Sequence, residues 1–175
     1  MDILAAQRQR GLKRLGDVRI FYMAGSPIPE VVAKAFVDQG ITPQNIYGMT
    51  ESSSHQYTHP DDPENIWIST CGRGGPGYEV KIWDRDNRDE EAAAGTTGEI
   101  GGRGAALMLG YYANQSATEN TFNRHGYMMS GDLGSFDAGG NLRIEGRVKD
   151  LIIRGGHNIY PSQIEARALE RSAAG

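Results

Sequence analysis

Short runs of hydrophobic residues, separated by turns, mark the first third of the chain. Residues 18–23 are apolar except for Arg19, with β-branched and aromatic members, and predict a buried strand. Residues 29–40 carry apolar positions at helical spacing and predict an amphipathic helix, and Ile46 and Tyr47 predict the next strand. A strand, a helix and a strand in this order are typical of a parallel α/β sheet. We therefore expect residues 1–60, which begin with a helical stretch at 2–15, to be the end of an α/β subdomain.

The pattern changes near residue 60, where many short apolar segments alternate with glycine, aspartate and asparagine turns. Only residues 116–122 have helical spacing in this region. Short strands with regular turns are typical of a small antiparallel β-barrel or curled sheet, which we expect for residues 61–148. The expected strands are residues 66–68, 78–83, 98–101, 107–111, 128–129, 134–136 and 142–145.

The last segment, residues 149–175, predicts the beginning of a third, smaller unit. Residues 151–153 are apolar and predict a strand, and residues 154–158 predict a turn. Pro161 is a favourable first residue for the helix that we expect to continue to residue 171. The fold class predicted for the whole chain is thus α/β followed by a small antiparallel barrel, with the start of another domain.

Composition excludes some classes of function. The chain has 175 residues and a net charge of −4, which argues against a nucleic-acid-binding surface. Cys71 is the single cysteine, so no intrachain disulfide can form. No apolar run reaches the roughly 18 residues of a membrane span, and the first residues lack the apolar core of a signal peptide. We expect a cytoplasmic protein whose partners are small molecules.

The stretch from Asn45 to Glu51 contains the most varied functional groups. Tyr47 offers a flat ring, and Gly48 permits a close approach to the backbone. The hydroxyl of Thr50 can donate to a phosphate oxygen, and the Glu51 carboxylate is a hard ligand of the type that Mg²⁺ accepts. The alternative is a strand that ends in a polar turn, and on these residues alone the two interpretations have similar weight.

Two further segments place polar groups after apolar ones. Asp132 follows the apolar residues 127–129 and could accept hydrogen bonds from sugar hydroxyls, unless it belongs to a simple glycine–aspartate turn. Arg147 could bind ribose or phosphate oxygens, unless it belongs to a surface charge cluster. Gly155 and Gly156 permit a close approach by a ligand, or form an ordinary hairpin turn.

These motifs occur in one order, and together the chain resembles the adenylate-forming superfamily of acyl-CoA synthetases, luciferases and peptide-synthetase adenylation domains. The continuation at residues 151–161 is similar to the acyl-CoA synthetase branch. The resemblance covers nearly the whole chain. It is carried by Gly25-Ser26, residues 47–51, Gly98-Glu99-Ile100 with Gly110-Tyr111-Tyr112, residues 130–133 and residues 146–150.

The resemblance implies a carboxylic acid–CoA ligase that uses ATP, Mg²⁺ and CoA and forms an acyl-adenylate from a small carboxylic acid. Adenine would lie between Gly25-Ser26 and Tyr47, next to Gly48 and Met49. Thr50 would hold phosphate and Glu51 the metal, as the catalytic pair, while Asp132 and Arg147 would bind the ribose.

For the remaining positions the resemblance implies a hinge at Lys149 and an acyl or CoA site near Gly48, Met49, Gly155 and Gly156. His55 is close enough in sequence to face the acyl site, but a surface-loop histidine is the simpler expectation.

The superfamily also has a glycine-rich phosphate loop upstream of the Gly25-Ser26 region and a distal catalytic lysine, and neither lies within these 175 residues. We therefore expect this polypeptide alone to be a weak catalyst or none. The alternatives are an adenylation domain, a luciferase-like enzyme, or a non-catalytic nucleotide-binding fragment.

Overall fold

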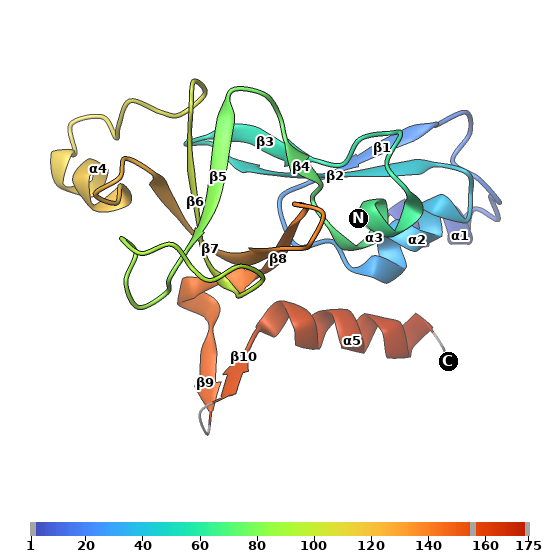
Figure 1. The fold of residues 1–175 in the computed structure, drawn as a ribbon. Coiled ribbons are helices and arrows are strands. Elements are labelled where there is room, and N and C mark those ends of the chain that lie inside the picture. The colour runs from blue at the N-terminus through green and yellow to red at the C-terminus, as the bar shows by residue number, and fades with distance from the viewer. Residues whose placement is uncertain (1–2, 155–156, 174–175) are drawn as a thin grey trace.

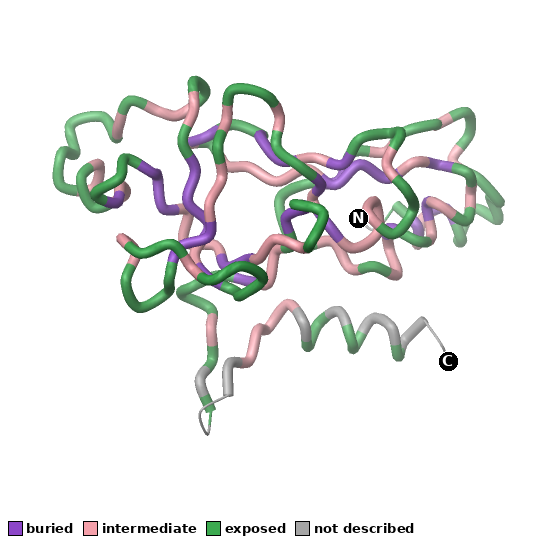
Figure 2. The backbone as a smooth tube through the Cα atoms, in the orientation of Figure 1, coloured by how far each residue is buried: buried purple, intermediate pink, exposed green. Residues whose placement is uncertain are grey.

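Two four-stranded sheets form most of the β-structure, and a long helix lies below them in the view of Figure 1. The computed structural model describes residues 3–154 and 157–173. Figure 2 shows that buried backbone is concentrated in the strands of both sheets and in the helix beside the first sheet, while connecting loops are mostly exposed. In the described ranges no helix is long and apolar enough to cross a membrane.

The first sheet begins with the predicted strand–helix–strand unit. β1 and β2 run parallel, with Ile20 opposite Thr42, and α2 connects them. Met23, Ala33, Phe36 and Ile41 form the buried core between this helix and the sheet. The elements are α1 (Ile3–Gln9), β1 (Ile20–Met23), α2 (Glu30–Val37) and β2 (Thr42–Met49). The prediction of a parallel α/β unit is therefore confirmed.

The same sheet continues with antiparallel strands, so it is mixed. β3 (Ser53–Tyr57) pairs with β2, and β4 (Arg73–Gly74) pairs with β3. Between them lies α3 (Glu64–Ser69), where we expected a strand at residues 66–68; that prediction is wrong. A three-residue apolar run does not distinguish a strand from one helical turn. Pro63 immediately before the helix and Glu64 in its first turn are the helix-start signals that decide the structure here.

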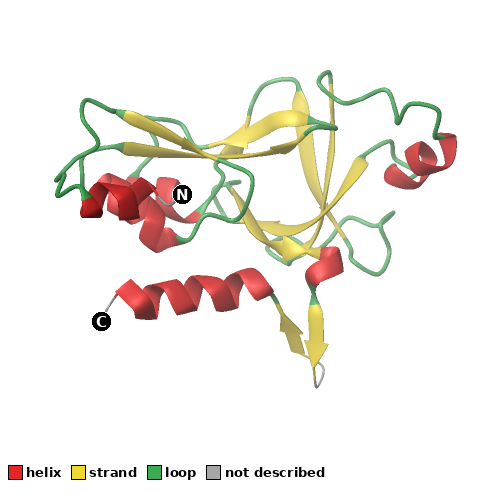
Figure 3. Cartoon of the chain, turned by 180° about the vertical axis from the view of Figure 1, so that it is seen from behind, coloured by secondary structure: helices red, strands yellow, loops and turns green. Residues whose placement is uncertain are grey.

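The second sheet contains four antiparallel strands in chain order, which confirms the predicted antiparallel part of the fold class. In the described residues the sheet stays open rather than closing into the expected barrel (Figure 3). Residues 107–111 form no strand, and the segments expected at 128–129 and 134–136 are one strand. Ile82, Ile100 and Leu142 form its core. The elements are β5 (Tyr78–Trp83), β6 (Gly98–Gly104), α4 (Gln115–Thr121), β7 (Met128–Phe136) and β8 (Leu142–Arg147).

The C-terminal segment contains the expected strand and helix, but residues 157 and 158, which we expected in a turn, begin a second strand that pairs with the first. A single 3₁₀ turn, η1 (Val148–Asp150), leads into the hairpin of β9 (Ile152–Arg154) and β10 (His157–Ile159) and then into α5 (Pro161–Ala173). The helix runs beside the first sheet in Figure 1, and the hydroxyl of Ser162 donates to the carbonyl oxygen of Glu145 on β8 at 2.8 Å. This contact ties the start of the helix to the second sheet.

Candidate nucleotide-binding site

A cleft of about 860 Å³ lies where the first sheet, the second sheet and α5 meet. Gly25 and Ser26 line it from the loop after β1, and Tyr47, Gly48 and Met49 line it from the end of β2. In parallel α/β sheets ligands bind at the carboxyl ends of strands. Asp132, Gly146 and Arg147 contribute from the second sheet. The cleft therefore collects most of the candidate residues from segments that are distant in sequence.

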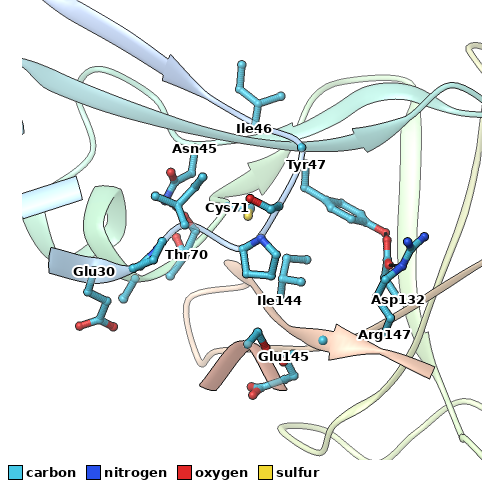
Figure 4. Close-up of a pocket in the computed structure, with 18 of the residues that line it drawn as sticks. Glu30, Asn45, Ile46, Tyr47, Thr70, Cys71, Asp132, Ile144, Glu145 and Arg147 are labelled. Carbon is cyan, nitrogen blue, oxygen red and sulfur yellow. Dashed lines mark hydrogen bonds and ion pairs between the residues drawn. The ribbon is translucent and has the colours of Figure 1, made fainter. Parts of the chain in front are cut away.

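Tyr47 joins the two sheets through Asp132. Its hydroxyl donates to Asp132 Oδ2 at 2.9 Å, across 85 residues of sequence, while Arg147 Nε donates to Asp132 Oδ1 at 3.1 Å. Figure 4 shows the tyrosine ring reaching from β2 toward these two side chains. Burial, together with the negative charge of Asp132, raises the pKa of Tyr47, so the phenol stays a neutral donor.

The local structure of β7 explains why Asp132 faces the cleft. Asp132 lies opposite Arg147 in the β7–β8 pairing, so it sits within one strand rather than between the two strands expected at residues 128–129 and 134–136. Gly131 has φ +74°, a conformation that favours glycine, and its N–H donates to Glu99 Oε1 at 3.0 Å. The N–H of Asp132 donates to Ser130 Oγ at 3.1 Å. The side chains of Glu99 and Ser130 thus fix the backbone directly before the carboxylate.

Thr50 and Glu51 occupy the turn between β2 and β3. The N–H of Ser52 donates to the Met49 carbonyl at 3.1 Å and closes the turn, and Ser53 follows with φ +58°. A tight turn followed by a residue with positive φ is a common hairpin connection. The Thr50 side chain is exposed and, like Glu51, lies just beyond the residues that line the cleft. Both follow Met49 directly, so they stand at its edge.

The packing of the β2–β3 hairpin requires glycine at position 48, which the sequence alone did not reveal. A Cβ at this position would overlap the Ser53 carbonyl oxygen and would lie 2.6 Å from Ser54 Cα. The close approach is therefore made by the opposite strand of its own hairpin. The residue also lines the cleft, so this glycine is required by the hairpin and lies at the candidate site as well.

His55 is not a surface-loop residue, and that expectation is wrong. It lies within β3 and is only 7% exposed, and its ring stacks on Tyr78 with centroids 4.1 Å apart. The edge of its ring meets Tyr47 at a centroid distance of 5.5 Å. Burial lowers the pKa of His55 to about 4. The histidine does not line the cleft but supports the tyrosine that does.

The last candidate positions belong to the C-terminal segment. Lys149 is exposed in η1, directly after the strand that carries Arg147, and it does not line the cleft. Gly155 and Gly156, expected near a CoA site, lie outside the described residues.

Residues 1–112 match the family described as "AMP-binding enzyme". The chain belongs to this family of AMP-binding enzymes. Its relatives include the medium-chain fatty-acid–CoA ligase of Escherichia coli (strain K12), which is 36% identical over 89% of this chain and 27% of its own length. The 2-succinylbenzoate–CoA ligase of Bacillus cereus (strain Q1) is 35% identical over 93% of the chain and 34% of its own length. This AMP-binding chain thus spans about a third or less of the curated relatives that it matches.

Solved structures show the same fold. The O-succinylbenzoate coenzyme A synthetase of Bacillus subtilis, in complex with ATP and magnesium ion, superimposes with a TM-score of 0.82 at 30% identity. The match covers 98% of this AMP-binding chain and 36% of the other. The MatB protein of Rhodopseudomonas palustris with bound ATP matches at a TM-score of 0.76 and 29% identity, over 85% and 29% of the two chains.

Sequence reasoning assigned no role to several polar side chains that line the cleft, among them Glu30, Asn45 and Thr70. Asn45 is 4% exposed, lines the cleft, and donates from Nδ2 to the carbonyl oxygens of Trp67 and Thr70, each at 3.0 Å. Its Oδ1 is buried and has no protein partner in the described part of the chain. The available signal was an amide directly before the apolar residues Ile46 and Tyr47 of a predicted strand, because a buried amide usually needs hydrogen-bond partners.

The residues present fit a magnesium ion bound together with a nucleotide. The described part of the chain contains no cluster of three or more histidine, cysteine or acidic residues that could hold a metal by itself. Mg²⁺ commonly needs only one or two carboxylates, because substrate phosphates and water complete its octahedron. Glu51 supplies such a carboxylate at the edge of the cleft, beside the hydroxyl of Thr50.

Proposed function

We propose that the chain is part of an ATP-dependent carboxylic acid–CoA ligase. The observation that carries the proposal is the cleft in which Tyr47, Asp132 and Arg147 converge from three strands. Support comes from relatives named as CoA ligases and from solved relatives that contain ATP. The chain spans about a third or less of those relatives, so the natural protein that contains it is the one to assay.

The proposed adenosine site uses both walls of the cleft. Adenine lies between the backbone of Gly25-Ser26 and the ring of Tyr47, and stacking on an aromatic ring contributes roughly 1–3 kcal/mol. The Asp132 carboxylate and the Arg147 guanidinium bind the ribose hydroxyls. Asp132 already accepts one hydrogen bond at each oxygen, and a carboxylate has about four lone-pair sites in all. It can therefore accept from a sugar without releasing its protein partners.

The proposed phosphate end lies at the β2–β3 turn. Thr50 donates to a phosphate oxygen, and Glu51 holds Mg²⁺, which offsets charge between the phosphates and the incoming carboxylate. The carboxylate oxygen of the acid attacks the α-phosphorus and pyrophosphate leaves. The thiolate of CoA then attacks the acyl carbon, the thioester forms, and AMP leaves. Thr50 and Glu51 are the catalytic pair in this scheme.

The remaining assignments complete the proposal. Gly48 and Met49 border the acyl group, and Lys149 is the hinge at which the segment that begins with η1 rotates between the half-reactions. Residues 1–60 and 61–148 form two subdomains that hold the nucleotide, and residues 149–175 begin the mobile unit. The exposed position of Lys149 between β8 and β9 supports a hinge.

The test uses the natural protein that contains these residues. With ATP, Mg²⁺ and a panel of small and medium carboxylic acids, it should exchange labelled pyrophosphate into ATP and release acyl-CoA. An Asp132→Asn variant should lose most of the exchange, while Arg143→Gln, an exposed position on β8, serves as the matched control. Loading of a carrier protein instead of CoA would indicate an adenylation domain. AMP binding without turnover would indicate a nucleotide-binding protein.

A further inference from the structure

The loop between β6 and α4 is tied to the turn that carries Glu51. The N–H of Met108 donates to the carbonyl oxygen of Glu51 at 2.7 Å. The hydroxyl of Tyr111 donates to Glu51 Oε1 at 3.0 Å, across 60 residues of sequence. One contact fixes the backbone of Glu51 and the other fixes its side chain, so this loop sets where the carboxylate points.

The loop is itself held by α4. The N–H of Tyr111 donates to Thr118 Oγ1 at 2.9 Å, and the Thr118 hydroxyl donates to the carbonyl oxygen of Asn114 at 3.0 Å. Gly110 has φ +150°, and a Cβ there would lie 2.9 Å from Thr118 Cγ2. Glycine therefore lets the loop pack tightly against the helix. The result is a braced connection from α4 through Tyr111 to Glu51.

We propose that Tyr111 is a positioning residue that orients the Glu51 carboxylate for Mg²⁺·ATP. This inference rests on the function proposed above. Mg²⁺ demands near-ideal octahedral geometry, and carboxylates that bind metals are themselves commonly held by hydrogen bonds. Tyr111 engages one oxygen of Glu51, and the carboxylate keeps further lone pairs for a metal.

The chemistry of the donor supports this role. A phenol is neutral near pH 7, so it can hold the carboxylate without placing a positive charge beside the metal. A lysine or arginine in the same place would compete with Mg²⁺ for the same anion.

The neighbouring tyrosine provides a matched control. Tyr112 is completely exposed, whereas Tyr111 is 40% exposed. Within the residues that the structure describes, the Tyr112 hydroxyl makes no hydrogen bond. Tyr111→Phe and Tyr112→Phe therefore remove the same oxygen from adjacent positions, and only the first change touches Glu51.

The experiment measures metal affinity directly. Mn²⁺ replaces Mg²⁺ as a probe, and electron paramagnetic resonance follows its binding to the natural protein in the presence of ATP. Tyr111→Phe should weaken Mn²⁺ binding about 10-fold or more, the usual effect of removing a group that orients a metal ligand. Tyr112→Phe should match the wild type, and saturating Mg²⁺ should restore the turnover rate of Tyr111→Phe. In a Glu51→Gln background, Tyr111→Phe should cause no further loss.

Each outcome decides between the possibilities. Normal Mn²⁺ affinity in Tyr111→Phe, alongside normal wild-type binding, overturns the positioning role and leaves the proposed function intact. Equal loss of AMP affinity and Mn²⁺ affinity, without rescue by Mg²⁺, means that the tyrosine only supports the fold and also overturns the role. Failure of the wild-type protein to bind either AMP or Mn²⁺·ATP overturns the proposed function, and this inference with it.

Discussion

The change Tyr47→Phe removes one hydroxyl and separates the two roles assigned to this tyrosine, the hydrogen bond to Asp132 and the stacking on adenine. The ring remains and can still stack on adenine, but Asp132 loses the donor that holds Oδ2 at 2.9 Å. A hydrogen bond to a charged group contributes about 1.5–3 kcal/mol. Asp132 keeps its contact with Arg147, whose side chain is 64% exposed, so the carboxylate is not left alone. We therefore expect a cost near the lower end, about 1.5–2 kcal/mol, in the free energy of unfolding.

The same change should weaken AMP binding about threefold to tenfold, because a carboxylate with fewer restraints loses part of that energy. Tyr47→Ala removes the ring as well and should cost roughly 1–3 kcal/mol more in binding free energy. Calorimetric titration with AMP measures binding, and urea unfolding measures stability. A double-mutant cycle with Asp132→Asn isolates the coupling between the two side chains.

Two results would refute this reasoning. One is a coupling energy near zero, which would mean that the Tyr47–Asp132 contact does not join the sheets. The other is an equal loss of AMP affinity in Tyr47→Phe and Tyr47→Ala, which would mean that the ring does not contact the base.

Three other changes test separate parts of the structure. Gly48→Ala should destabilise the protein by about 1–3 kcal/mol in urea unfolding, because its Cβ meets the Ser53 backbone, which cannot move aside; unchanged stability would contradict the geometry. Burial lowers the folded-state pKa of His55 to about 4, so the unfolded chain binds more protons between that value and about 6.5. The free energy of unfolding should therefore fall as pH drops through this window. His55→Phe, which keeps a ring against Tyr78, should flatten this pH dependence, and an unchanged slope would contradict the burial of a neutral His55. Burial raises the pKa of Cys71 to about 12, so iodoacetamide at pH 7 should alkylate it far more slowly than a free thiol, and rapid labelling would show an open thiol.

The βαβ unit could be read from the sequence because its pattern is local. The apolar strands, the helix between Pro29 and Gly40 and the turn after β1 each depend on residues within a few positions of one another. The misread segments are those in which local pattern and environment disagree. Residues 66–68 are apolar but helical, and residues 107–111 are apolar but belong to a loop fixed by Glu51 and Thr118.

The candidate site shows the same division between what a local pattern predicts and what depends on tertiary contacts. Motif order identified Tyr47, Asp132 and Arg147, and the structure brings these three side chains together. Sequence could not show that Gly48 is required by its own hairpin or that Tyr111 reaches Glu51. Those facts depend on contacts between strands and loops, which no periodicity encodes.

The most direct measurement compares AMP with an analogue that lacks both ribose hydroxyls, each titrated calorimetrically into the natural protein. Asp132 and Arg147 are assigned to those hydroxyls, and hydrogen bonds to charged groups contribute about 1.5–3 kcal/mol each. AMP should therefore bind about tenfold or more tightly than the analogue, and Asp132→Asn should remove most of the difference. Equal affinity for the two compounds, or no binding of AMP at all, would contradict the account.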